Sequence, residues 1–412
     1  MSRKIALGLV AMAVAFASIA AVAETVVSGR TGGGAFYRIV VPDVWNGNLV
    51  IWNHGFDLDP PSALDAGDMG PLAPLQLSEG YAVAASSYQQ NGWAVFKTKN
   101  DLQHLVATFR DRFGQPNEII VTGASLGGIV TASAIEEANL GNVTGAYAIC
   151  GAVAGSRNWD GAVDLRLAYD AVCANTPAAA IPGGAGGLPK NSTMTPTEMA
   201  LKVNACTGIL TPPAYQTAQQ QANLAKILSV TKLPASFLIT DMGFATFGLQ
   251  NLVYDQGKLA GKIAIGNRYV DYDDAQINAT IARVTPNPGA ANRMAKSYTP
   301  TGNVGQTKIV TLHTDKDGLV IVENESEYAS VVPAANLAMG IVVEAAPSHC
   351  GFTGSETVAG WESLRGWLAG APKPSAASIQ GLCTYISGGA PGQCRIDPSF
   401  VVPDMDGRVR PR

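Results

Sequence analysis

The chain has 412 residues, of which 28 are lysine or arginine and 32 are aspartate or glutamate, giving a formal net charge of −4. Only 15% of the residues are charged, whereas 47% are hydrophobic, and 45 glycines and 24 prolines imply many tight turns. This composition argues against a nucleic-acid-binding protein and against a disordered one, and the length predicts a main domain that carries a large insertion.

The N-terminus has the layout of a secretory signal peptide. Basic residues in MSRK precede the apolar run IALGLVAMAVAFASIA, which ends in an Ala-Val-Ala cleavage site at residues 21–23. We expect residues 1–23 to be removed, although an uncleaved membrane anchor is the alternative. Because no other apolar stretch is long enough to span a bilayer, we expect a secreted or periplasmic protein without a stable membrane anchor.

Residues 24–155 alternate between strand and helix patterns. The runs ETVVSGR, AFYRIVVP, LVIWNHG and YAVAASSY predict four strands separated by turns and a Pro-rich loop. A helical stripe over about 96–113 follows, and then the apolar run EIIVTGAS, the helix LGGIVTASAIEEAN and the strand VTGAYAIC. This order predicts an α/β fold with a mostly parallel central sheet flanked by helices.

The pattern changes after residue 155. Residues 156–304 contain helical stretches such as LRLAYDAVC, TPTEMALKVNAC and YQTAQQQANLAKIL, and alternation resumes with KIVTLHTD, a helix near 323–329, IVVEAA and SETVAGWESLRGWLAG. We therefore predict four parts. After the signal peptide, a core is formed by residues 24–155 and 305–370, and a helical cap of residues 156–304 is inserted between strands 6 and 7 of that core. A Pro/Gly-rich tail of residues 371–412 follows the core.

Ser125 stands between two glycines where a buried strand passes into a helix, in Gly123-Ala124-Ser125-Leu126-Gly127. G-x-S-x-G is a weak pattern alone, but at a strand-to-helix turn it predicts a serine in strained backbone angles with room only for small neighbours. Such a turn holds the hydroxyl at a helix N-terminus, where amides stabilise negative charge. Ser125 is thus a candidate nucleophile.

A nucleophilic serine needs a base, and the base needs an acid that orients it. His349 lies in a loop between the last strand and the last core helix, where sites in open α/β sheets gather. Of the other three histidines, His54 lies in a loop before the serine, His104 lies in a helix and His313 lies within a strand. The acid is expected in the loop after KIVTLHT, which offers Asp315 and Asp317.

Four motifs together resemble secreted serine esterases of the α/β-hydrolase family. They are WNHG at 52–55, GASLGG at 123–128, HTDKDGLV at 313–320 and SHCGF at 348–352. The resemblance covers the mature chain apart from the insertion and the tail, and it implies the α/β-hydrolase fold with the chain order Ser, Asp, His. It favours Asp317 over Asp315 as the acid. It also implies an oxyanion hole formed by the amides of Leu126 and of Phe56 or Gly55, with His54 in a structural role.

Six cysteines in an exported chain suggest three disulfides, and the absence of C-x-x-C spacing argues against zinc. The simplest pairing joins Cys173 with Cys206 and Cys383 with Cys394, which clamps the tail and leaves Cys150 with Cys350. A Cys150–Cys350 bridge would tether the loop of His349 to the sheet. Feruloyl esterases and tannases have a disulfide between the neighbours of serine and histidine, but Ala124 precedes Ser125 here, so similarity to them and to polyester depolymerases is distant.

These observations predict an enzyme that hydrolyses carboxylic esters through Ser125, His349 and Asp317, with an acyl-enzyme intermediate and without a metal or organic cofactor. The low charge and the apolar cap favour an uncharged ester, either a small molecule or carried by a polymer. A peptidase or amidase of the same fold uses the same residues and is the first alternative. An inactive hydrolase-fold binding protein is the second. The acyl and alcohol groups stay open.

Overall fold

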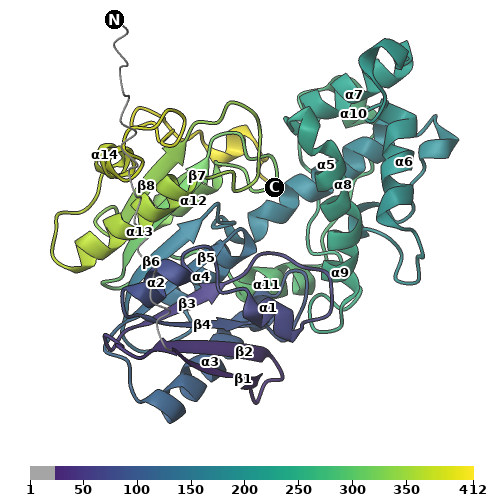
Figure 1. The fold of residues 1–412 in the computed structure, drawn as a ribbon. Coiled ribbons are helices and arrows are strands. Elements are labelled where there is room, and N and C mark those ends of the chain that lie inside the picture. The colour runs from purple at the N-terminus through teal and green to yellow at the C-terminus, as the bar shows by residue number, and fades with distance from the viewer. Residues whose placement is uncertain (1–23) are drawn as a thin grey trace, which may run out of the picture.

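The computed structural model describes residues 24–412, so the predicted signal peptide lies outside the described residues. An eight-stranded sheet with the order β1-β2-β4-β3-β5-β6-β7-β8 forms the centre of the molecule (Figure 1). Its strands are β1 (Glu24–Arg30), β2 (Phe36–Pro42), β3 (Leu49–Asn53), β4 (Ala82–Ser86), β5 (Ile119–Ala124), β6 (Val143–Ile149), β7 (Lys308–Thr314) and β8 (Leu337–Val342). β2 runs antiparallel to β1 and β4, and every later pair is parallel. The mostly parallel sheet predicted from the sequence is present.

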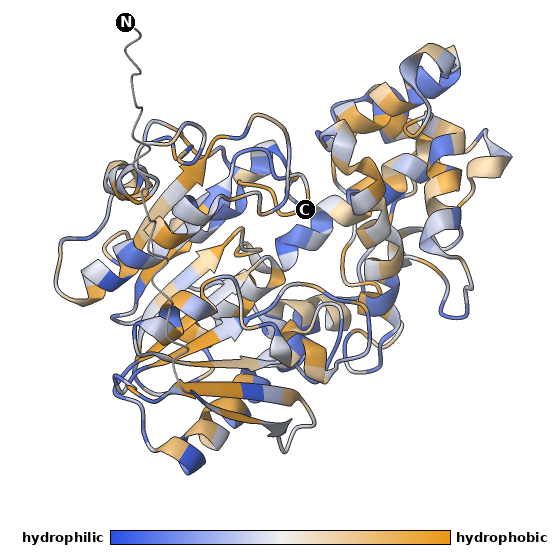
Figure 2. Cartoon of the chain, in the orientation of Figure 1, coloured by the Kyte–Doolittle hydropathy of each residue, from blue (hydrophilic) through white to orange (hydrophobic). Residues whose placement is uncertain are grey.

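Helices cover both faces of this sheet. On one face α3 (Val95–Phe113) and α4 (Leu126–Glu136) pack together, and on the other lie α2 (Ala73–Ser78) and α13 (Gly354–Leu368). Leu49 and Ile51 of β3 belong to the α3–α4 core, whereas Val50 belongs to the α13 core. Successive side chains of a strand point to opposite faces, and since both faces are covered, β3 is apolar throughout. Figure 2 shows the hydrophobic residues gathered on these central strands.

The segment between β6 and β7 is helical. It contains α5 (Asn158–Val172), α6 (Pro196–Thr207), α7 (Ala218–Thr231), α8 (Leu238–Gly243), a π-helical turn (Phe244–Gly248), α9 (Leu249–Tyr254), α10 (Ala275–Thr280) and α11 (Pro288–Ser297). Helices α5 to α10 stand to one side of the sheet (Figure 1), and α5 to α8 share a hydrophobic cluster of their own. The last helix, α11, instead contacts α3 of the core. A disulfide joins Cys173 at the end of α5 to Cys206 in α6.

The C-terminal tail differs from its prediction in two ways. It contains the helix α14 (Ala376–Ile386), which packs on α13 and β8. The predicted Cys383–Cys394 disulfide is absent: both cysteines are free thiols, and Cys383 Sγ donates to Gln393 O at 3.6 Å and Cys394 Sγ to Gln380 O at 3.4 Å. After α14 the chain runs back, and its end lies between the sheet and the α5–α10 helices (Figure 1). Across residues 24–412, we find no helix with the length and hydropathy needed to span a bilayer.

Candidate active site

Ser125 occupies the turn between β5 and α4 with φ 57° and ψ −121°. A positive φ is unfavourable for a residue with a Cβ, so the surrounding structure must hold it in place. Two hydrogen bonds to neighbouring backbone do so: Ser125 N–H donates to Ile149 O at 3.0 Å, and Ala152 N–H donates to Ser125 O at 3.1 Å. The serine is therefore anchored to the carboxyl end of β6.

The glycines beside Ser125 are required by close backbone approach. A Cβ on Gly127 would lie 1.9 Å from Asn53 O, and one on Gly123 would lie 2.3 Å from Gly127 O. A Cβ on Gly128 would meet Gly151 Cα at 2.3 Å. The start of α4 can thus press against the ends of β3 and β6 only if these positions carry no side chain.

Ser125, His349 and Asp317 form one line of hydrogen bonds. Ser125 Oγ is 2.9 Å from His349 Nε2, and His349 Nδ1 is 2.6 Å from Asp317 Oδ2. The Asp317 carboxylate is buried, and its Oδ1 accepts the amides of Leu319 at 2.9 Å and Val320 at 3.0 Å. Because both carboxylate oxygens are bound, the orientation of the acid toward the imidazole is fixed.

Asp315, the other candidate acid, has different hydrogen-bond partners. Its Oδ1 accepts the amide of Glu344 at 2.8 Å, and its own amide donates to Val342 O at the end of β8. It therefore braces the β7 and β8 loops against each other, and the structure does not bring it to His349.

The three remaining histidines have structural surroundings. His104 is exposed on α3. His54 stacks on Tyr88 with ring centroids 4.2 Å apart, and its Nδ1 donates to Gly55 O at 2.9 Å. His313 is fully buried at the end of β7.

His313 lies directly behind the acid of the triad. Its Nε2 is 2.7 Å from Val320 O, and its Nδ1 is 3.1 Å from Glu325 Oε1, whose partner oxygen accepts from Thr311 Oγ1. A carbonyl and a carboxylate can only accept, so both ring nitrogens donate and the ring is cationic. Burial lowers the pKa of His313, but the hydrogen bond and charge of Glu325 outweigh it, and the net pKa is raised. This cation lies 4.0 Å from Asp317 Oδ2. Sequence reasoning treated it only as a histidine within a strand.

The proposed oxyanion donors gather around the serine. Leu126 is the first residue of α4, and a Cβ on Gly55 would lie 3.7 Å from Ser125 Cβ. Phe56 lines the cavity that Ser125 opens onto. Within residues 24–412, the amides of Leu126, Gly55 and Phe56 have no protein acceptor. Free amides next to a nucleophile at a helix N-terminus are suited to binding a negatively charged oxygen.

A disulfide connects the two halves of this site. Cys150 follows β6 and is bonded to Cys350, which follows His349, and the two residues are 200 positions apart in the chain. Cys350 Sγ is 3.4 Å from His349 Nε2, so the bridge packs against the imidazole itself. On the other side, Ile149 next to Cys150 holds the amide of Ser125. The bridge thereby links the backbone that carries Ser125 to the loop that carries His349.

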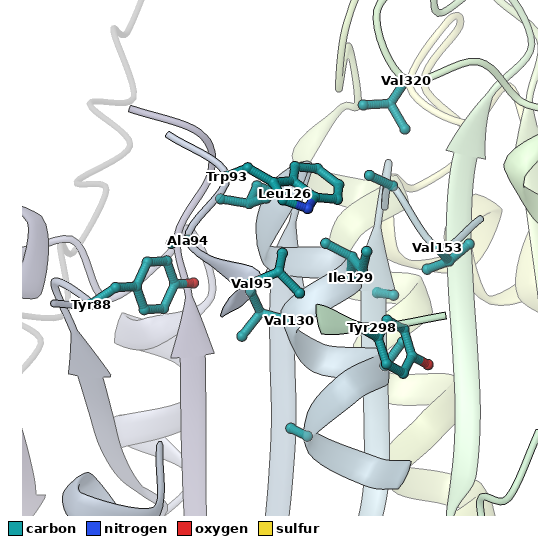
Figure 3. Close-up of a cluster of buried hydrophobic side chains, with 14 of the residues drawn as sticks. Tyr88, Trp93, Ala94, Val95, Leu126, Ile129, Val130, Val153, Tyr298 and Val320 are labelled. Carbon is teal, nitrogen blue, oxygen red and sulfur yellow. The ribbon is translucent and has the colours of Figure 1, made fainter. Parts of the chain in front are cut away.

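A cavity of about 120 Å³ opens beside Ser125, between the sheet and the α5–α10 helices. Its walls are mostly apolar and include Phe56, Trp93, Trp159, Leu165, Leu233, Phe244, Leu319 and Val320. Figure 3 shows Trp93 packed on Leu126 above the α4 residues Ile129 and Val130. The rings of Phe56 and Phe244 are 4.8 Å apart, which joins the oxyanion loop to the π-helical turn after α8.

The C-terminal tail forms part of the same cavity. Met405, Arg408, Val409 and Arg410 all line it. The tail is held there by Arg157, which donates to Asp406 Oδ1 at 2.6 Å and to Val409 O at 3.1 Å. Sequence reasoning missed these residues because the segment has no periodic pattern and lies far along the chain from every catalytic motif.

No family model and no curated protein matches the chain. Among solved structures, Candida antarctica lipase A in its closed state has a TM-score of 0.41 and 11% identity, over 94% of this chain and 83% of that one. The esterase RhEst1 from Rhodococcus sp. has a TM-score of 0.40 and 15% identity, over 84% and 98%. The Pyrococcus furiosus esterase Pf2001 has a TM-score of 0.34 and 14% identity, over 80% and 84%.

These similarities are weak, and the fold follows from the chain's own topology. In the sheet, β2 is antiparallel to its neighbours and the strands from β3 to β8 are parallel. Strand β4 lies between β2 and β3, so the spatial order of β3 and β4 is the reverse of their order in the chain. The serine turn follows the fifth strand, and the acid and the histidine follow the seventh and eighth. The protein has the α/β-hydrolase fold.

Proposed function

We propose that this protein is a serine hydrolase that cleaves carboxylic ester bonds, with Ser125 as nucleophile, His349 as base and Asp317 as the acid that orients the base. The observation that carries the proposal is the unbroken set of hydrogen bonds from Ser125 Oγ to His349 Nε2 and from His349 Nδ1 to Asp317 Oδ2. A hydroxyl, an imidazole and a buried carboxylate in this geometry have the arrangement that activates a serine for acyl transfer.

In the first half of the reaction, Ser125 Oγ attacks the carbonyl carbon of the ester while His349 Nε2 takes the hydroxyl proton. The oxyanion that forms is bound by the amides of Leu126 and of Phe56 or Gly55. Asp317 stabilises the imidazolium through its bond to Nδ1. When the intermediate collapses, the carbon–oxygen bond to the alcohol breaks and His349 gives its proton to that leaving oxygen.

In the second half, water attacks the acyl group on Ser125 as His349 Nε2 removes one of its protons. The second tetrahedral intermediate breaks the bond to Ser125 Oγ, which regains the proton from His349. The products are one carboxylic acid and one alcohol, so no cofactor or metal enters the balance. The apolar cavity walls favour substrates with apolar parts near the scissile bond.

We further propose that the protein is exported. The signal-like sequence of residues 1–23 supports this location, and the two disulfides are of the kind that persists in oxidising compartments. The substrate is then an ester that the protein meets outside the cytoplasm, either free or attached to a polymer.

The test uses the chain from residue 24 onward, purified with its disulfides intact. We expect hydrolysis of short p-nitrophenyl acyl esters, slower cleavage of matched aminoacyl p-nitroanilides, and one fluorophosphonate adduct by intact mass. Ser125→Ala should lose both activity and adduct while keeping the circular dichroism of the parent. Faster cleavage of the anilides would favour an amidase. A protein that forms no adduct, or forms it without Ser125, would instead be a binding protein.

A further inference from the structure

The cavity beside Ser125 contains four charged side chains, Asp164, Asp241, Arg408 and Arg410. Two of them are bound by the protein. Asp164 accepts from Tyr272 Oη at 2.6 Å and pairs with Arg412 at 2.9 Å. Arg410 donates to Val230 O at 2.7 Å and to Tyr272 O at 3.1 Å. These two side chains hold the tail against the cap helices.

The other two, Asp241 and Arg408, have no such partners. Within residues 24–412, neither side chain makes a hydrogen bond or an ion pair. Asp241 is only 9% exposed, and Arg408 is partly buried. Both side chains line the cavity and keep accessible polar atoms, so their unused hydrogen-bonding capacity is available to a ligand there.

Arg408 is the group that sets the charge of this ligand. Burial lowers the pKa of its guanidinium, but arginine keeps its charge in proteins. Glu323 and Asp241 are near enough to act on it electrostatically, although neither contacts it, and Glu323 is partly exposed to solvent, which screens its charge. Five N–H donors in a planar fork match the two oxygens of a carboxylate.

Asp241 opposes this positive charge less than an exposed carboxylate would, because it is harder to ionise. Burial, together with the negative charge of Asp317, raises the pKa of Asp241 well above its usual range, and Arg408 lowers it only in part. A neutral carboxyl can donate its own proton to an incoming carboxylate. Asp241 lines the same cavity as Ser125. It lies on α8, directly before the π-helical turn that carries Phe244.

From this arrangement we infer that the cavity holds a carboxylate subsite formed by Arg408 and Asp241, so that the preferred substrates are esters with a carboxylate at the end remote from the scissile bond. Half-esters of dicarboxylic acids and short oligomers of hydroxy acids have this chemistry. The inference rests on the proposed function. It also differs from the uncharged ester that composition favoured, because one unpaired arginine inside an apolar cavity does not register in the composition.

The subsite is built before the substrate arrives. Arg157 holds Asp406 and Val409 O, which flank Arg408 in the chain, and Arg410 is tied to Val230 O at the end of α7. Lys232 also donates to Gly407 O from outside the cavity. Binding energy from a remote carboxylate is then available to orient the ester at Ser125, because little of it is spent on ordering the tail.

The test compares two substrates of equal length, p-nitrophenyl hydrogen adipate and p-nitrophenyl methyl adipate, with the suberate pair as a check on chain length. We expect the parent protein to prefer the anionic ester by about 10- to 100-fold in kcat/KM, the range of a hydrogen bond to a charged group. Arg408→Gln should reduce that ratio to near one, and Arg408→Lys should keep part of it. Asp241→Asn should retain the preference, because the amide adds no negative charge that would repel the substrate carboxylate.

Lys190→Gln is the matched control, because it removes one positive charge from an exposed position that does not line the cavity, and it should leave the ratio unchanged. Binding of adipate to Ser125→Ala by calorimetry gives a readout that needs no catalysis, and Arg408→Gln in that background should weaken it by about the same factor. A parent that hydrolyses both esters equally, or an adipate affinity that does not respond to Arg408, would overturn the subsite. Loss of all ester hydrolysis and of the fluorophosphonate adduct would overturn the proposed function instead, while calorimetry would still decide on the subsite.

Discussion

Removal of the Cys150–Cys350 bridge should damage both stability and catalysis, whereas removal of Cys173–Cys206 should damage stability alone. In the chain-entropy description, a bridge between residues 200 positions apart is worth at most about 5 kcal/mol of unfolding free energy, and one with a separation of 33 about 4 kcal/mol. The two double alanine variants should therefore lose similar stability.

Their effects on catalysis should differ because only one bridge touches the site. Cys350 Sγ lies 3.4 Å from His349 Nε2, and Ile149, the neighbour of Cys150, holds the amide of Ser125 at 3.0 Å. Without the bridge, the segment that carries His349 is no longer covalently linked to the end of β6, which holds Ser125. A shift of the imidazole by about 1 Å relative to Ser125 costs about 100-fold in rate. We expect kcat to fall by about 10- to 100-fold in Cys150→Ala/Cys350→Ala and by less than about twofold in Cys173→Ala/Cys206→Ala.

The assay is kcat on a p-nitrophenyl ester at a denaturant concentration where each variant is fully folded, with stability taken from urea unfolding followed by tryptophan fluorescence. The reasoning would be refuted if both variants lost activity equally when folded, or if the Cys150–Cys350 variant kept the kcat of the parent. Either result would mean that packing alone positions His349.

Three further predictions concern single side chains. Asp317→Asn should lower kcat by about 10⁴-fold, because the imidazole loses the charge that orients it, whereas Asp315→Asn should lower kcat by less than about tenfold. Similar losses of kcat for the two variants in steady-state assays would refute the assignment of Asp317 as the acid. His313→Gln should lower kcat by about 10- to 100-fold with little change in KM. The pKa of His313 is higher in the folded protein than in the unfolded chain, so its contribution to stability is complete at pH values below the unfolded pKa and is lost as the pH rises through the folded pKa. The difference in Tm between the parent and His313→Gln should therefore become smaller as the pH rises. A difference that becomes larger would contradict a cationic ring. Gly127→Ala should cost more than about 3 kcal/mol in urea unfolding, since its Cβ would meet Asn53 O, whereas Gly381→Ala within α14, where the Cβ meets nothing within 4 Å, should be neutral or stabilising. Equal stabilities for these two alanine variants would show that the turn can relax.

The local features of this protein could be predicted from the sequence, because short-range patterns determine them. The turn at Ser125 depends on glycines two residues to either side, and the strands of the sheet depend on runs of apolar residues that need both faces covered. The places of Asp317 and His349, each in a loop after a strand, followed from the alternation of strands and helices.

What only the tertiary structure decided are the contacts between segments far apart in the chain. The charge of His313 depends on acceptors that Val320 and Glu325 supply from beyond the strand. Whether Cys383 and Cys394 are free or bonded depends on the relative geometry of the two side chains, which the packing of the tail sets. Arg408 reaches the cavity of Ser125 only because the tail folds back between the sheet and the cap. No periodicity marks such a segment, since its position is set by ion pairs and hydrogen bonds with groups that the fold alone brings near.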